Sequence, residues 1–296
     1  MEIKTWHRPL MVLVAAMALL TVGTAVAILV DDRVLLGAPA WMKPFKFSVS
    51  ILLYSLTLAW VLSLLPRRSR VVEWSAFVIV LALVAEMVVI AGQTVRGTTS
   101  HYNESTPLNA TLWDIMSIAI MVLFLAHIVI SIAVLRARIP NRVARTGVAL
   151  GLGISVIGLL AATPMVAARD VGAHTVGALD GGPGLPVVGW STVAGDLRIG
   201  HFIGLHGLQA LPLLAWALTR FAARMSDRTK VRLLLVAGAG YAGVTVLTTW
   251  QALRGQSLIH PDALTLAAFG ILAGVVLGGA GLIVRNDRRE ELELAA

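Results

Sequence analysis

One acidic residue stands inside a strongly apolar stretch of the chain. Glu86 lies in the apolar run 73–94, about eight residues from its end, which at about 1.5 Å per residue is near the middle of a bilayer. A carboxylate in hydrocarbon is costly, so it is by default expected to serve function. We expect Glu86 to donate or accept a proton. The alternative is a protonated Glu86 that forms a hydrogen bond to a neighbouring helix.

Two polar residues of a later apolar run match Glu86 in depth. His206 and Gln209 lie in the run 201–221, three residues apart and therefore on one helix face. An imidazole that faces a carboxylate provides two groups suited to acid–base catalysis. We expect Glu86, His206 and Gln209 to form a catalytic group. The alternative for His206 is a hydrogen bond between helices.

Five further polar residues are placed to bind a substrate: Tyr54, Gln93, Arg96, Gln251 and Arg254. Tyr54 lies deep in its apolar run, and the other four lie near the ends of theirs. An arginine in that place can clamp an anionic headgroup, a carboxylate or a propionate. It can equally extend to the membrane surface from the helix end, so both interpretations of the two arginines stay open.

Histidines are the strongest metal ligands that the sequence offers, because the chain has no cysteine. The lack of cysteine also excludes disulfides and thiolate-bound metal clusters. The candidate metal ligands are His101, His201 and His206, and the candidate cofactor is haem or a metal ion. His127 lies deeper in its run and is expected to be a packed polar residue. The motifs of zinc proteases, serine hydrolases and P-loop proteins are absent.

The composition places these residues in a membrane. Of the 296 residues, 57% are hydrophobic and 14% charged, whereas a soluble domain has roughly 25% charged residues. The net charge of +8 comes largely from arginines in short turns between apolar runs, so it indicates membrane orientation rather than nucleic-acid binding. We expect neither a separate soluble domain nor a nucleic-acid partner.

Eight apolar windows are long enough to cross a hydrocarbon core of about 30 Å as helices. They are 9–30, 47–65, 73–94, 111–135, 146–167, 201–221, 231–252 and 263–285. Basic residues precede the first window and follow every second one, and the positive-inside rule makes that side cytoplasmic. The sequence therefore predicts an all-α, multi-pass membrane protein with both termini in the cytoplasm.

The loops on the other side are longer and rich in Gly, Pro, Trp and His. The longest spans 168–200, and such a loop is uncommon without a function such as a lid or a plug. An ordinary flexible loop is the alternative. Small residues recur at four-residue spacing in the later windows and predict close helix packing; they include Gly147 and Gly151, Ala239 and Gly243, and Gly270, Gly274 and Gly278.

Short motifs recur in the same order in the two parts of the chain. Gln-x-x-Arg-Gly follows the third window at 93–97 and the seventh at 251–255, each time with a histidine soon after. Leu-Ala-Trp occurs in the second and the sixth window. Collinear matches indicate a duplicated four-helix unit, and four crossings give both copies the same orientation. We expect the halves to be 1–140 and 141–296.

Three segments resemble a family of uncharacterised bacterial polytopic membrane proteins: WMKPFKFSVS from Trp41, QTVRGTTSHYN from Gln93 and GDLRIGHFIGLHGLQALP from Gly195. The resemblance covers most of the chain and implies the bacterial cytoplasmic (inner) membrane, but no activity. In architecture the chain is also similar to haem A synthase, which has eight spans in two related halves. That family binds haem through histidines on even-numbered spans, which here hold His127, His201 and His206, with a complete pair in neither half.

Two main classes of function stay open. The first is a membrane-embedded enzyme or redox protein with an outward-facing site for a lipid, a quinone, haem or a metal. The second is a proton-coupled transporter or channel with Glu86 and His206 between its halves. A structural subunit of a larger complex, or of an oligomer, is a third. The gathering of polar residues near the outer side favours the first, since a transporter should also have polar residues along its cytoplasmic half.

Overall fold

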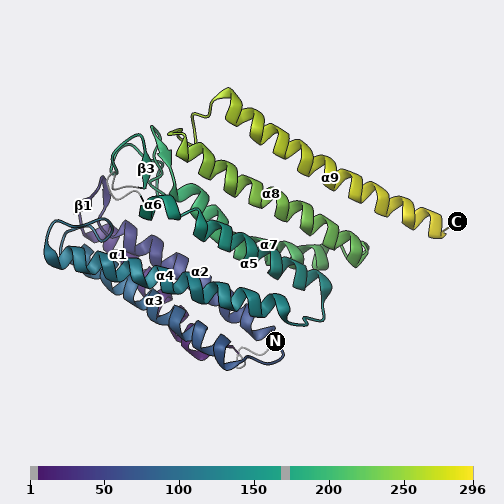
Figure 1. Ribbon diagram of the computed structural model, residues 1–296, viewed down its shortest axis with the longest axis horizontal. Coiled ribbons are helices and arrows are strands. Elements are labelled where there is room, and N and C mark those ends of the chain that lie inside the picture. Colours follow the sequence, from purple (N-terminus) through teal and green to yellow (C-terminus); the bar gives the residue numbers. More distant parts are fainter. Residues whose placement is uncertain (1–5, 168–173, 296) are drawn as a thin grey trace. The chain divides into compact units, whose positions relative to one another are not determined.

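The computed structural model describes residues 6–167 and 174–295 and is mainly helical (Figure 1). The helices are α1 (Arg8–Val30), α2 (Met42–Ser63), α3 (Arg70–Val95), α4 (Pro107–Arg136), α5 (Arg142–Leu160), α6 (Thr163–Ala167), α7 (Arg198–Phe221), α8 (Asp227–Leu253) and α9 (Ala263–Ala295). Two short antiparallel hairpins occupy loops. In one, β1 (Val34–Leu35) pairs with β2 (Ala38–Pro39), and in the other β3 (Thr175–Val176) pairs with β4 (Gly195–Asp196).

Eight stretches of helix among the described residues are long and apolar enough to cross a membrane. This confirms the predicted number of spans and the all-helical, polytopic architecture. Helices suit this environment because they satisfy every backbone hydrogen bond within one segment, without water. The chain is therefore described as an integral membrane protein, and the ends of its helices opposite the arginine-rich turns are called the outer ends.

The fifth predicted span, 146–167, differs from the helices that form there. Helix α5 already ends at Leu160, and after a two-residue turn α6 begins at Thr163. Pro164 gives the reason, because it has no N–H for the helical bond and its ring clashes with the carbonyl of the residue four earlier. The single expected helix is thus broken near its outer end.

The described residues form two compact units. The first comprises Met1–Ala137, Pro164–His174 and Ala178–Ser191, and the second comprises Arg138–Thr163, Thr175–Gly177 and Thr192–Ala296. In the first unit α1 packs on α2 and α3 on α4, with further contacts of α3 to α1 and α2. In the second, α5 packs on α7 and α8 on α9, with further contacts of α8 to α5 and α7.

Small residues bring α5 and α7 of the second unit close together. A Cβ added at Gly158 of α5 would lie 2.5 Å from the carbonyl carbon of Gly204 in α7. Gly147 and Gly151 likewise face α7, which confirms that their four-residue spacing serves close packing. The corresponding series in α9 differs, because a Cβ at Gly270, Gly274 or Gly278 would meet no neighbouring atom of the described chain within 4 Å.

A part of the long outer loop packs within the first unit. The Lys46 ammonium donates a hydrogen bond of 3.1 Å to the carbonyl of Val188. Gly37, between β1 and β2, has a φ of +73°, and an added Cβ would lie 2.9 Å from the carbonyl oxygen of Gly181. Only glycine adopts this backbone conformation without strain and leaves room for such an approach. Residues 178–191 are therefore held against the outer ends of this unit.

Candidate functional site

Four aromatic rings gather at the outer ends of α2 and α4 and in the loop between α3 and α4. The ring centroid of His101 lies 5.4 Å from that of Trp113 and 5.7 Å from that of Phe47. Tyr102 completes the group, with its ring 4.7 Å from Trp113. His101 was expected to be a metal ligand, and here aromatic side chains surround it.

A histidine of the long outer loop joins these rings. His174 lies 6.2 Å from His101 and 5.1 Å from Tyr102, measured between ring centroids. Its Nδ1 is 2.5 Å from Oδ2 of Asp180, and the same carboxylate accepts a hydrogen bond of 3.2 Å from the backbone N–H of His174. The carboxylate thus fixes the orientation of the imidazole. Phe47, His101, Tyr102, Trp113, His174 and Asp180 are called the outer cluster.

Sequence reasoning did not select His174 and Asp180 as site residues. The available signal was a histidine followed six residues later by an aspartate in a loop rich in glycine. Short loops of this kind can bring such a pair together, since their backbone turns sharply. What the sequence lacks is any local sign that His174 packs against residues 101 and 102, more than seventy positions earlier.

Lys43 lies at the outer end of α2, in the same unit as the outer cluster and Glu86. The positive charge of Lys43 acts on both Glu86 and His101. Burial lowers the pKa of His101 well below its ordinary value, and the charge of Lys43 and the neighbouring His174 lower it further. Glu86 is 5% exposed. The predicted carboxylate and a buried histidine thus both lie within the electrostatic reach of one lysine.

The pKa of His101 gives a testable dependence of stability on pH. The unfolded chain binds a proton at His101 below its ordinary pKa of about 6.5, whereas the folded chain binds it only at lower pH. Acidification from pH 7.5 to 5 is expected to destabilise the protein, by at most about 1.4 kcal/mol per pH unit from this group. The check is the melting temperature in detergent across this range for the wild type and His101→Gln.

The matched control is His260→Gln, at an exposed histidine. It should keep the pH dependence of the wild type, while His101→Gln should lose part of it. Part of the remainder is expected from His7, whose pKa burial also lowers despite the nearby Glu73. Equal pH dependence of the wild type and His101→Gln would contradict the assignment.

The predicted binding residues Gln93 and Arg96 bond within their own unit. Gln93 is 1% exposed, and its amide donates to Oδ1 of Asn109 at 3.0 Å. The Arg96 guanidinium donates to Oε1 of Gln93 at 2.5 Å and to Oδ1 of Asn109 at 3.0 Å. These bonds join the end of α3 to the first turn of α4.

Gln251 and Arg254 make similar bonds in the second unit. The amide of Gln251 donates to the carbonyl of Ser257 at 2.7 Å. Arg254 donates to Oδ2 of Asp262 at 2.6 Å and to Oγ1 of Thr265 at 3.0 Å, and its guanidinium lies 4.5 Å from the ring centroid of Trp250. The hydrogen bonds of Arg254 and of Thr265 hold the pKa of Asp262 well below its usual range.

Tyr54 lies beside His127, which was expected from the sequence to be a packed polar residue outside the site. Its hydroxyl lies 2.9 Å from Nδ1 of His127, and the ring centroids are 5.9 Å apart. His127 is fully buried. The structure therefore adds His127 to the polar groups inside the first unit and gives Tyr54 a partner at that depth.

The remaining predicted residues lie in the second unit. Nδ1 of His206 is 3.3 Å from Oε1 of Gln209, so these two side chains come together as their spacing predicts. Nδ1 of His201 donates to the carbonyl of Gly158 at 2.8 Å, across the α5–α7 contact. Glu86 and His101 belong to the first unit, so the predicted pairing of Glu86 with His206 stays a prediction.

Metal ligation by His101, His201 and His206 also stays a prediction. Among the residues that the structure describes, no group of three or more His, Cys, Asp or Glu side chains lies close enough together to hold a metal ion. Comparison of the chain with models of protein families, with curated proteins and with solved structures finds no match. The function must therefore be argued from the site itself.

Proposed function

We propose that the chain is a membrane-embedded enzyme whose acid–base site is the outer cluster, together with Lys43 and Glu86. The observation that carries this proposal is the bond of 2.5 Å between His174 and Asp180, beside His101. When Nδ1–H of an imidazole donates to a carboxylate, the basic lone pair lies on Nε2, and the carboxylate stabilises the imidazolium that forms. His174 is then the general base.

The surroundings of His174 suit an amphipathic substrate. Tyr102, Trp113 and Phe47 offer apolar ring faces, and aromatic rings pack well against the ring of a quinone or the chain of a lipid. Lys43 supplies a positive charge for an oxyanion that develops during the reaction. Glu86, deeper in the same unit, serves as a second proton donor or acceptor. We therefore propose a lipid or a quinone from the outer side as the substrate.

The positions of the candidate histidine ligands favour acid–base chemistry over haem or metal binding. His201 and His206 are five residues apart on one helix, so their side chains point in different directions. A cofactor is therefore no part of the proposal.

We also propose that the two units arose by duplication, with halves near 1–140 and 141–296. The helix contacts occur in the same order in both units. Gly97 and Gly255 have φ of +71° and +73°, and each follows an arginine that bonds the third residue of the next helix, Asn109 or Thr265. The basic turns support an orientation with both termini inside, and we propose the bacterial cytoplasmic membrane as the location.

Turnover in reconstituted membranes tests the proposed enzyme. The purified protein is placed in vesicles made from total bacterial lipids and quinones, where it should consume one class of molecule. Mass spectrometry measures the amount of each molecule over time. Glu86→Gln should reduce the rate on the order of 100-fold, because it removes a proton-transfer group. Glu104→Gln, the same change at an exposed loop residue, should keep the wild-type rate.

Two results of this experiment would contradict the proposed enzyme. If no molecule is consumed, or if Glu86→Gln and Glu104→Gln react equally fast, the proposed enzyme is wrong. Proton-coupled transport is then the second candidate, supported by the buried Tyr54–His127 pair below Glu86. A pH-sensitive dye inside the same vesicles would report proton entry, which Tyr54→Phe should slow.

A further inference from the structure

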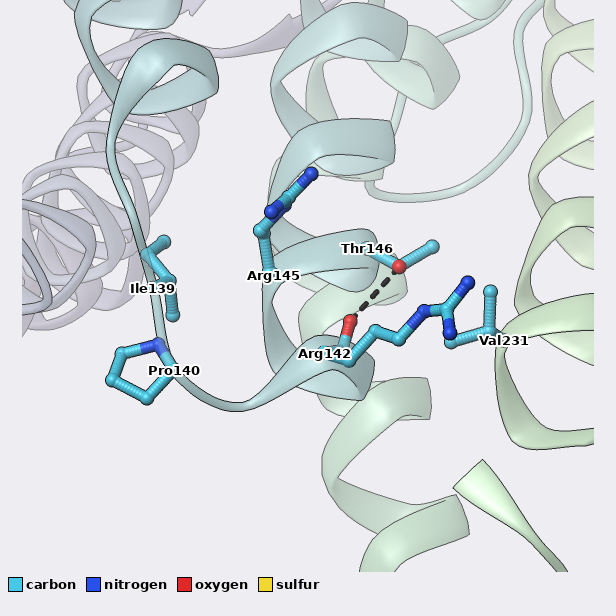
Figure 2. Close-up of a pocket in the computed structure, with 6 residues that line it drawn as sticks. All are labelled: Ile139, Pro140, Arg142, Arg145, Thr146 and Val231. Carbon is cyan, nitrogen blue, oxygen red and sulfur yellow. Dashed lines mark hydrogen bonds between the residues drawn. The ribbon is translucent and has the colours of Figure 1, made fainter. Parts of the chain in front are cut away.

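We propose that a cavity at the arginine-rich end of the second unit binds a phosphate group, supplied by the headgroup of an anionic phospholipid. The cavity has a volume of about 500 Å³. Its lining residues are Ile139, Pro140, Arg142, Arg145, Thr146 and Val231, drawn in Figure 2. They come from the turn before α5, the first turns of α5 and the start of α8. None of them belongs to the proposed acid–base site, so this inference stands apart from it.

Two cations in this cavity are exposed, and no carboxylate of the described side chains pairs with them. Arg142 and Arg145 are three residues apart and share a face of α5. Among the ion pairs of the described residues, neither arginine takes part. Like charges at this spacing repel each other. An anion bound between them would remove this repulsion.

The position of the two arginines adds to the excess of positive charge. They lie in the first turns of α5, where the helix dipole already disfavours a cation. The first turn of α5 has no acidic residue, whereas α3 has Glu73 and α8 has Asp227 in theirs. The arrangement therefore destabilises the start of α5 unless an anion is present, and it favours a polyvalent one.

The residues that line the cavity favour a phosphate that carries apolar groups. Planar guanidinium groups match the oxygens of a phosphate in pairs. Ile139, Pro140 and Val231 form an apolar part of the wall beside the arginines. The cavity lies at the end of membrane-spanning helices, which is the depth of phospholipid headgroups. The hydroxyl of Thr146 donates to the carbonyl of Arg142 at 2.9 Å and so serves the helix.

Native mass spectrometry of the detergent-purified protein tests the proposal. Titration with phosphatidylglycerol should reveal one tight site in the wild type, and phosphatidylcholine should bind it more weakly. The double variant R142Q/R145Q should weaken this site about tenfold or more, since it removes two charge-assisted contacts. R136Q/R138Q changes the charge equally in the same turn but outside the cavity, and Thr146→Val removes only the hydroxyl. Both controls should bind within about twofold of the wild type.

Two outcomes would overturn the proposal. One is equal weakening by the two double variants, which would mean a general attraction between lipid and basic protein. The other is unchanged binding in R142Q/R145Q, with its melting temperature showing an intact fold. If inorganic phosphate alone stabilises the wild type but not R142Q/R145Q, while lipid binding is the same in both, the lipid source is wrong and free phosphate is the ligand.

Discussion

Replacement of Gly158 by alanine is expected to destabilise the protein by about 1–3 kcal/mol or more, the largest effect on stability among the single substitutions considered. A Cβ at this position would lie 2.5 Å from the carbonyl carbon and 2.8 Å from the Cα of Gly204, and closer still to the backbone nitrogen of Leu205. These are backbone atoms, which no change of rotamer can move. Helices α5 and α7 must therefore separate, which also lengthens the bond of His201 to the Gly158 carbonyl.

The same helix provides the control for this prediction. Gly153→Ala adds a Cβ with no neighbouring atom of the described chain within 4 Å. It should leave stability unchanged or raise it by about 0.5–1 kcal/mol, because alanine restricts the unfolded chain more than glycine does. The measurement is unfolding in mixed micelles with increasing denaturing detergent, followed by tryptophan fluorescence. If Gly158→Ala unfolds at the same point as Gly153→Ala, the close contact of α5 with α7 is wrong.

The eight helices could be predicted from the sequence because a membrane imposes a simple rule. Each span needs about 20 apolar residues, and each must be a helix. The helix ends were harder to predict, since α3, α5 and α8 begin several residues before their apolar windows, after the capping residues Ser69, Asn141 and Ser226. Those residue types are common N-caps, so this signal was present in the sequence but is independent of hydropathy.

The repeated Gln-x-x-Arg-Gly motif shows how one local signal can support two interpretations. Its spacing near the outer ends suggested arginines that bind a substrate. Glycine after the last turn of a helix is also the common residue of a C-cap, and Gly97 and Gly255 both have the positive φ of that cap. Each cap directs the chain into the next helix, with which Arg96 or Arg254 forms its hydrogen bond.

The rest of the site depends on contacts that are distant in the sequence. His101 was selected for its position in the repeat, whereas its neighbour His174 comes from a long loop. No periodicity or spacing reports which loop residue meets which helix end, because loop paths are set by tertiary contacts such as that of Lys46 with Val188. Polar residues inside spans are predictable as candidates, and their partners are not.

Asp180→Asn is expected to reduce turnover by about 10²–10⁴-fold, the largest effect on activity among the substitutions proposed. Asparagine keeps an oxygen that can accept from the backbone N–H of His174, so the loop should retain its path. It loses the negative charge that stabilises an imidazolium at His174 and fixes the proton on Nδ1. This prediction rests on the proposed acid–base role, and it is measured with the molecule that the wild-type protein consumes in vesicles. Asp32→Asn, at an exposed aspartate of the same unit, should keep the wild-type rate.

A double variant distinguishes a shared catalytic role from a merely structural one. If Asp180 acts only through His174, then D180N/H174Q should be no slower than H174Q alone, because residues that act as a unit have non-additive effects. Multiplied losses in the double variant would show that Asp180 acts by another route and would contradict the pair. In another outcome, D180N unfolds at a lower temperature while each folded molecule reacts at the wild-type rate. That result would mean that the bond of 2.5 Å only stabilises the loop. The dependence of the turnover rate on pH also distinguishes the catalytic role from the structural one. Only if His174 is catalytic should the charge at position 180 change this dependence.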